Sequence, residues 1–187
     1  AEQFDLIVCS FNLSKHQDGY QLYEELRVKQ LIKNSTAFIF ISAETSGALV
    51  HSVLELQPDD FLVKPFTVQE LKTRIERILK RKNELQSIYT LVDDGNDSKA
   101  IKVIDAALNK KNNIYSPILL RLKGDALLRL NRSEEAKDFF TSVLDIQKFA
   151  WAKVGLVEAL IANNEHILAQ RMLKTMLERH ETRLVAL

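Results

Sequence analysis

The fold of the first half of the chain is indicated best by the stretch Asp59-Asp60-Phe61-Leu62-Val63-Lys64-Pro65-Phe66. It is a short apolar run, typical of a strand, that ends in a lysine and a proline. Two similar runs precede it: Phe4-Asp5-Leu6-Ile7-Val8-Cys9-Ser10 and Phe38-Ile39-Phe40-Ile41-Ser42-Ala43. Helical patterns separate the three runs. Residues 1–66 therefore predict strand–helix units that form a parallel sheet.

Two helices are expected between these strands, one from about Tyr20 to Lys33 and a less regular one near Ser46 to Leu56. A third helix begins after Thr67, a good N-cap residue, with which Glu70 forms a capping box. Apolar residues then recur at helical spacing from Val68 to Leu91. This pattern predicts one long helix, or two nearly collinear ones, joining the two halves of the chain.

The second half shows no strand pattern after Asp93-Asp94-Gly95, only helical periodicity broken by short polar turns. Its small residues repeat at a fixed spacing, Ala126 with Ala159 and Ala136 with Ala169. A period in the mid-thirties, with small residues where helices cross, is typical of stacked helical hairpins.

The three strand ends resemble the receiver domain of two-component response regulators. The resemblance implies that Ser10 stands at the position of the phosphate-accepting aspartate, that Ser42 and Lys64 match the family's hydroxyl and lysine, and that Phe61 matches its aromatic switch residue. It covers about the second half of the receiver fold, because the run ending at Ser10 looks like that fold's third strand. The expected fold class is α/β plus all-α, with a partial flavodoxin-like receiver of three parallel strands over residues 1–82.

The helical half resembles the tetratricopeptide repeat, with Gly124, Ala126, Ala136 and Phe140 standing where that family has its signature residues. The resemblance implies a repeat domain over residues 83–187 whose groove binds a peptide or helix of another protein. Polar residues on related turns of the first helices are groove candidates: Arg121, Asp125, Arg129 and Glu158.

The chemistry of the receiver family requires a carboxylate nucleophile, and a serine hydroxyl is a weak nucleophile without an adjacent base. We therefore expect a degenerate receiver that is coupled to protein recognition and is not an enzyme. Mg²⁺ is expected only if an acidic pair lies upstream. Two alternatives remain open: a working receiver whose phosphorylation controls partner binding, and an enzyme that uses Ser42, Lys64 and Asp18.

The composition excludes some classes of partner. The chain carries 26 basic and 25 acidic residues, so no net field attracts nucleic acid or an anionic membrane surface. Its lone cysteine, Cys9, lies in an apolar strand, and no apolar run is long enough to span a membrane, which favours a cytoplasmic location. The expected partners are another protein, a histidine kinase or phosphotransfer protein, and a second copy paired at the strand from Phe4 to Cys9.

Overall fold

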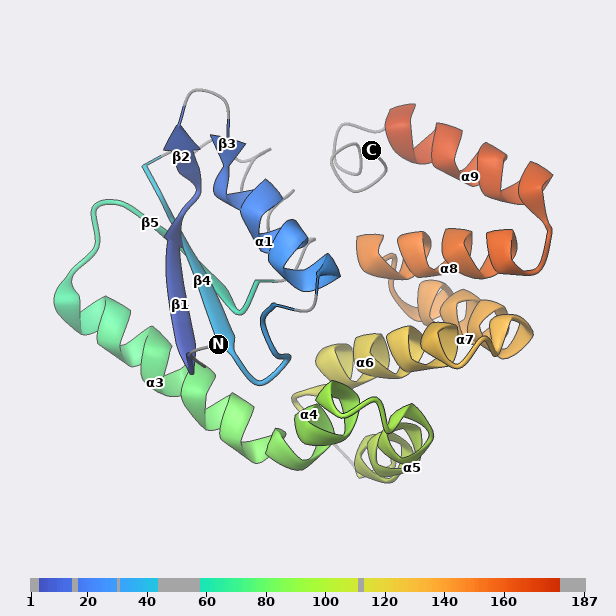
Figure 1. The fold of residues 1–187 in the computed structure, drawn as a ribbon, viewed down its shortest axis with the longest axis horizontal. Coiled ribbons are helices and arrows are strands. Elements are labelled where there is room, and N and C mark those ends of the chain that lie inside the picture. The colour runs from blue at the N-terminus through green and yellow to red at the C-terminus, as the bar shows by residue number, and fades with distance from the viewer. Residues whose placement is uncertain (1–3, 15–16, 30, 44–57, 111–112, 179–187) are drawn as a thin grey trace. The chain divides into compact units, whose positions relative to one another are not determined.

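The computed structural model describes residues 4–14, 17–29, 31–43, 58–110 and 113–178 (Figure 1). The chain divides into two compact units, Ala1–Asp93 and Asp94–Leu187. Residues 83–93, which the sequence assigned to the second domain, fall within the first of these compact units. The helix expected near 46–56 lies outside the described residues. The first unit is α/β and the second is helical, which confirms the predicted fold class.

The first unit contains a parallel sheet of three strands in the order β1–β4–β5: β1 (Leu6–Ser10), β4 (Ala37–Ser42) and β5 (Asp60–Val63). The register pairs Leu6 with Ala37 and Ile39 with Asp60. This sheet confirms the three predicted strands. A small antiparallel pair, β2 (Asn12–Ser14) and β3 (Gln17–Asp18), follows β1 and was not predicted.

Alternate side chains of the sheet fill two cores. One core lies on the side of α1 (Gly19–Val28) and contains Cys9, Phe11, Tyr23, Phe38, Phe40 and Phe61. The other lies on the side of α3 (Val68–Glu84) and contains Ala37, Ile39, Leu62 and Ile78. Figure 1 shows the two helices on either side of the sheet. The strands are apolar on both faces because both faces are covered.

The first helix ends at Val28, before the expected end at Lys33. Beyond it the chain turns, so that the backbone N–H of Asn34 reaches the Asp93 carboxylate at 2.8 Å. A helix that continued to Lys33 would carry Asn34 away from Asp93. The hydrogen bond between them therefore favours the earlier end of the helix.

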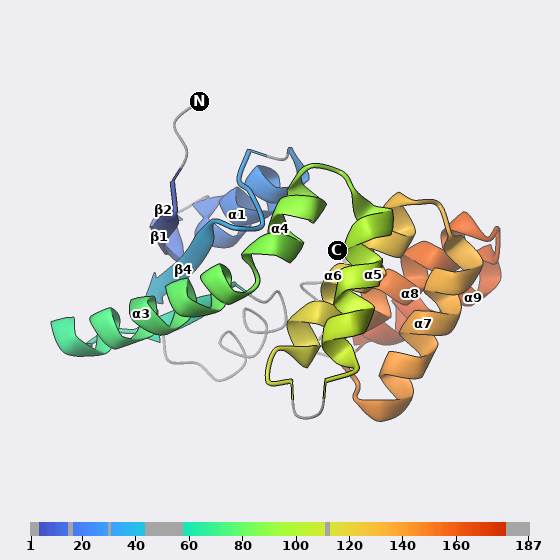
Figure 2. The same ribbon diagram turned by 90° about the horizontal axis from the view of Figure 1, so that it is seen from below.

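The helix that begins at Val68 has the predicted capping box: the Thr67 hydroxyl accepts from the Glu70 N–H at 3.1 Å, and the Glu70 carboxylate accepts from the Thr67 N–H at 2.7 Å. The prediction of one long helix is wrong, because α3 ends at Glu84 and α4 (Gln86–Asp93) begins after a break at Leu85. Figure 2 shows α4 turning away from the axis of α3, so the two helices are not collinear. The turn buries apolar residues of α4 and brings Asp93 to the segment that precedes β4.

The second unit contains five helices in its described part: α5 (Asp97–Leu108), α6 (Ser116–Arg129), α7 (Ser133–Ile146), α8 (Ala150–Ala162) and α9 (His166–Glu178). Consecutive helices pack on each other, and α6 also contacts α8. The repeating alanines are buried: Ala126, Ala136, Ala159 and Ala169. Their small size allows the close crossings that the sequence predicted.

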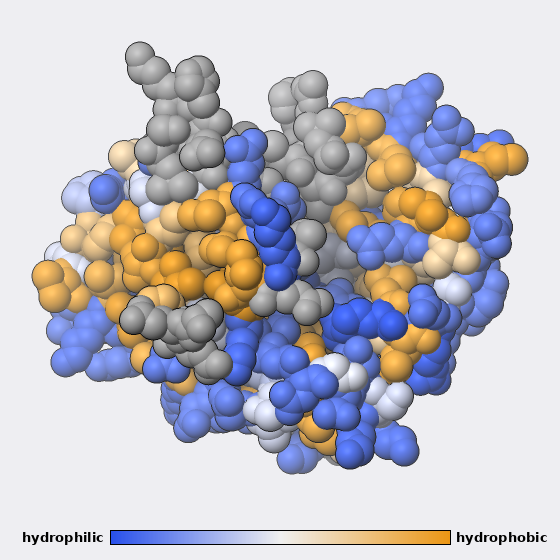
Figure 3. All heavy atoms as spheres, viewed as in Figure 1, coloured by the Kyte–Doolittle hydropathy of each residue, from blue (hydrophilic) through white to orange (hydrophobic). Residues whose placement is uncertain are grey.

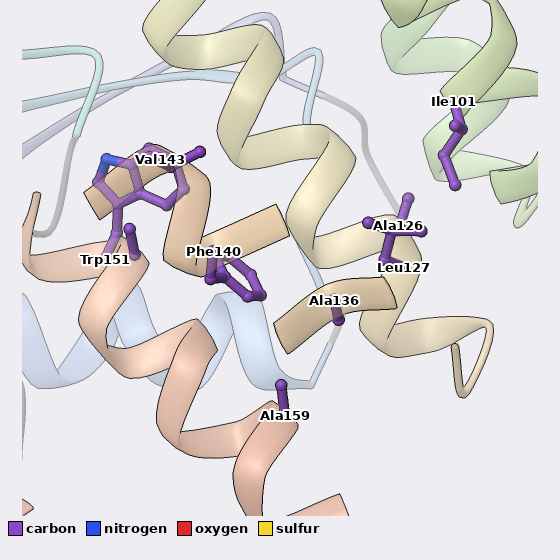
Figure 4. Packing of buried hydrophobic residues seen from close by; sticks show 9 residues of the cluster. Ile101, Ala126, Leu127, Ala136, Phe140, Val143, Trp151 and Ala159 are labelled. Atoms are coloured by element: carbon purple, nitrogen blue, oxygen red, sulfur yellow. The ribbon is translucent and has the colours of Figure 1, made fainter. Parts of the chain in front are cut away.

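Phe140 forms the centre of this core (Figure 4). Its ring is fully buried and fits against two glycines: a Cβ atom at Gly124 would lie 2.5 Å from the ring, and one at Gly155 would lie 2.3 Å from it. Gly155 on α8 and Gly124 on α6 therefore have the same role, which is to leave room for the Phe140 ring. Trp151 meets the same ring edge-to-face at 6.4 Å.

The turns of the second unit repeat as its helices do. Asn131 and Asn164 both have positive φ, at 54° and 62°. In each turn the next residue donates a backbone hydrogen bond five residues back, from Arg132 to the Leu127 carbonyl at 3.0 Å and from Glu165 to the Leu160 carbonyl at 2.8 Å. Asparagine tolerates this left-handed conformation better than other residues with a Cβ atom. The spacing of the turns matches that of the alanines.

Candidate functional site

The residues matched to the receiver site lie along one edge of the sheet. Because the strands are parallel, their carboxyl ends share that edge, and the register pairs Ser10 with Ile41 and Ser42 with Val63. Lys64 follows β5 directly, and its backbone N–H donates to the Ser42 carbonyl at 2.7 Å. The structure therefore brings Ser10, Ser42 and Lys64 to the same edge.

These three side chains differ in exposure. Ser10 and Lys64 are exposed, whereas Ser42 is buried. The Ser10 hydroxyl donates to the Asn12 carbonyl at 3.0 Å. Among the described residues, this backbone oxygen is the hydrogen-bond partner of the hydroxyl, and the hydroxyl forms no hydrogen bond to a carboxylate or imidazole that would act as its base.

Gly19 shapes the same edge, a role that no sequence pattern indicated. A Cβ atom at Gly19 would lie 2.2 Å from the Ser10 carbonyl oxygen, so no other residue fits there without moving the backbone. Its N–H donates to the Phe11 carbonyl at 2.5 Å. The glycine at the start of α1 thus fixes the loop that follows Ser10.

Phe61, which the receiver resemblance matched to the aromatic switch residue, is buried in the α1-side core. Its ring meets Phe11 edge-to-face with the centroids 6.1 Å apart, and Phe11 meets Phe40 in the same way at 5.8 Å. The side chain therefore joins the loop after β1 to the middle of the sheet.

The resemblance to receivers implies a divalent cation, and the residues at this edge do not fit one. Ser10 offers a neutral hydroxyl where a carboxylate ligand would be needed, and the nearby Lys64 is cationic. Within the described ranges, no group of three His, Cys, Asp or Glu side chains could hold a metal ion. Protein sites for Mg²⁺ usually supply one or two carboxylates, which waters or phosphates complete.

A charged network occupies the opposite edge of the sheet, before β4 and β5. The Asp59 carboxylate accepts from the Phe38 N–H at 2.9 Å, binds Lys82 Nζ at 3.0 Å and also pairs with Arg81. Its neighbour Asp60 pairs with two exposed arginines of α3. No sequence motif identified this network, because its members are far apart in the chain and only folding brings them together.

Lys82 is buried at the centre of the network. Its ammonium donates to the Asn34 carbonyl at 2.8 Å and lies 4.8 Å from the centre of the Tyr89 ring. Burial lowers the pKa of Lys82, and the Asp59 carboxylate opposes that shift. Burial also raises the pKa of the Tyr89 hydroxyl, with Asp59 adding to the rise. These contacts attach α3 and α4 to the sheet within the first unit.

Three of the four groove candidates, Arg121, Asp125 and Arg129, lie on α6, and the fourth, Glu158, lies on α8. Arg121 and Asp125 form an ion pair at 4.0 Å on α6. Partial desolvation raises the pKa of the Glu158 carboxyl on α8, and the Asp125 carboxylate adds to the rise, which places these two acids near each other. Arg129 is used differently: it binds the buried Asp97 with Nη2 at 2.7 Å and Nε at 3.1 Å, and so joins α6 to α5.

Comparisons with known proteins find likenesses for both parts of the chain. Residues 1–76 match the response regulator receiver domain, and residues 82–154 match the N-terminal tetratricopeptide repeat region of Psidin. The receiver match thus covers the N-terminal part of the chain. No solved structure matches the chain significantly.

Three relatives illustrate the likeness. The transcriptional activator protein IrlR of Burkholderia pseudomallei is 32% identical over 136 residues, which are 73% of this chain and 54% of the relative. The transcriptional regulatory protein CiaR of Streptococcus pneumoniae is 33% identical over 105 residues, covering 54% of this chain and 45% of the relative. A probable chemotaxis protein CheY of Rhizobium etli is 33% identical over 73 residues, covering 39% of this chain and 55% of the relative.

The chain spans about half the length of these relatives. The part of the first unit that is matched, residues 1–76, is similar in sequence to response regulator receiver domains. None of the described helices combines the length and the apolar character needed to cross a membrane.

Proposed function

We propose that this chain is part of a cytoplasmic two-component signalling protein in which a degenerate receiver is joined to a repeat module that binds another protein. Its action is recognition and not catalysis. The observation that carries the proposal is Ser10 at the end of β1, exposed and hydrogen-bonded to a backbone carbonyl, where a receiver would have its aspartate.

The retained parts of the site support a role in signalling. Ser42 and Lys64 stand at the neighbouring strand ends, and Phe61 joins the edge to the core. A histidine kinase or phosphotransfer protein that recognises receivers can dock on such a surface without transferring phosphate. The family likeness supports that kind of partner.

The groove candidates support recognition of a polypeptide. Asp125 and Glu158 lie near each other on α6 and α8, the first helices of two successive hairpins, which contact each other. Stacked hairpins form extended surfaces of this kind for binding peptides. We assign the partner to the protein class and not to nucleic acid, because the 26 basic residues are balanced by 25 acidic ones.

A second copy of the chain is a further partner in this proposal. β1 is the outer strand of the described sheet, and Phe4 and Val8 are 58% and 44% exposed. Figure 3 shows apolar surface gathered over the first unit. An uncovered parallel edge with apolar side chains favours pairing with another strand.

Peptide binding tests the recognition proposal. We expect peptides that the chain binds on an array to lose about tenfold in affinity when Glu158→Lys reverses the charge on α8, because the reversal replaces an attraction to the peptide with a repulsion. Lys174→Glu, on the exposed face of α9, is the matched control and should leave binding unchanged. Equal losses in both variants, or no loss in either, would place the peptides elsewhere.

A further inference from the structure

A cavity of about 240 Å³ lies within the second unit, bounded by α7, α8 and α9. The residues that line it are Leu144, Lys148, Lys153, Met172, Thr175 and Met176. None of them belongs to α6. The cavity is therefore a separate site from the surface of α6 and α8 that carries Asp125 and Glu158.

The size of the cavity limits what it can hold. Small-molecule sites in proteins usually have volumes of 300–1,000 Å³, so this one is small for a metabolite or cofactor. It is large enough for one bulky side chain. Leu144 and two methionines supply apolar walls, and methionine adapts its shape to different apolar partners.

The charge at the cavity is positive. Lys148 is exposed and Lys153 is half-buried. Neither lysine forms an ion pair with any carboxylate in the part of the chain that the structure describes, whereas five other basic side chains of the second unit do: Arg121, Lys123, Arg129, Arg132 and Lys137. Two unpaired ammonium groups beside an apolar cavity complement an apolar group that is flanked by carboxylates.

We propose that this cavity is a docking site for a partner polypeptide, which inserts one bulky apolar side chain between α7, α8 and α9 and places adjacent acidic residues against Lys148 and Lys153. The anchor would give the affinity and the lysines would give the preference for acidic neighbours. The site adds a second contact surface to the groove and does not depend on it.

Fluorescence anisotropy with the full chain tests the proposal. The probes are labelled pentapeptides with four glutamates around a central Trp, Phe, Leu or Ala, together with a version of the Phe peptide in which the glutamates are lysines. We expect the bulky residues to bind about tenfold or more tightly than Ala, because burying a large apolar side chain stabilises the complex. The lysine version should bind most weakly, and added salt should weaken the glutamate peptides.

Three variants locate the binding. Lys153→Glu should weaken the Phe peptide about tenfold, while Lys174→Glu, which makes the same charge change outside the cavity on α9, should not. Thr175→Trp should abolish binding by filling the cavity from an exposed helix position, where the fold tolerates a larger side chain; circular dichroism checks that it does. Arg121→Ala, in the groove of α6, should have no effect.

Several results would overturn the proposal. No preference for bulky residues over Ala would exclude the anchor, and equal losses in Lys153→Glu and Lys174→Glu would exclude the two lysines as a specific contact. Loss of binding in Arg121→Ala would assign the peptides to the groove. Binding that occurs only in a chain ending at residue 178 would identify the protein's own last residues as the occupant.

Discussion

Phe140→Ala is expected to lower the free energy of unfolding of the second unit by about 3–5 kcal/mol. The Phe140 ring is fully buried, and two glycines, Gly124 and Gly155, make room for it. Alanine would leave a cavity that the surrounding helices cannot fill without moving, because the glycines have no side chains to extend into it. Urea denaturation followed by tryptophan fluorescence measures the change, since Trp151 is the only tryptophan of the chain and contacts the ring.

Ile146→Ala is the matched control for this prediction. Ile146 lies on the same helix as Phe140 but is 87% exposed, so its replacement should change the stability by about 0.5 kcal/mol or less. A loss below about 1 kcal/mol for Phe140→Ala would show that the helices do not pack around this ring as the structure describes.

Asp59→Ala is expected to destabilise the first unit by about 3 kcal/mol. The substitution removes the carboxylate that neutralises Lys82 and Arg81, and it leaves the Phe38 N–H without that acceptor. Breaking a buried ion pair by removing one partner typically costs 3–5 kcal/mol, and the remaining contact of Lys82 with the Asn34 carbonyl puts the expected loss at the low end. Hydrogen exchange of the β4 amides and urea denaturation followed by circular dichroism would both report it.

Asp60→Ala makes the same change one residue away. Its partners Arg74 and Arg77 are 44% and 69% exposed, so they remain hydrated when the carboxylate is lost. The carboxylate also accepts from the Phe61 N–H, so the expected cost is about 1–1.5 kcal/mol. Adding Lys82→Met to Asp59→Ala should recover part of the loss, because the unpaired buried charge is then gone. Similar losses for Asp59→Ala and Asp60→Ala would contradict the special role given to the buried network.

The destabilisation by Asp59→Ala should also depend on pH. Burial lowers the pKa of Lys82 in the folded state, and without Asp59 nothing of comparable strength opposes that shift. Between the lowered pKa and the ordinary lysine value, the unfolded chain binds more protons than the folded one, so stability rises with pH in that window. The loss in the variant should therefore shrink as the pH approaches the ordinary lysine pKa.

Local patterns in the sequence predicted much of the fold. The three strands were identified because each is a short apolar run with a polar exit, and parallel pairing then placed Ser10, Ser42 and Lys64 at one edge. The capping box at Thr67 and the buried alanines of the helical half were identified for similar reasons, since each depends on residues within one element or on a regular repeat.

Features that depend on contacts between distant residues could not be predicted. The break at Leu85 lies inside an uninterrupted apolar period, and the bonds of Asp93 to Asn34 become visible only when α4 folds back onto the sheet. The Asp59 network has the same origin. Arg129 was expected in the groove from its helical position, yet Asp97 engages its guanidinium in an ion pair. The role of Gly155 also depends on a distant contact, since it makes room for the ring of Phe140 in the neighbouring helix.

The intact mass of the protein after incubation with acetyl phosphate and Mg²⁺ tests the central claim most directly. The account predicts that the mass is unchanged in conditions where an ordinary receiver gains one phosphoryl group, because β1 ends in a serine whose hydroxyl, among the described residues, bonds to a backbone carbonyl and not to a base. A Ser10→Ala variant treated in the same way provides the reference. A gain of one phosphoryl group that disappears in Ser10→Ala would contradict the account and would show that the first unit is a working receiver.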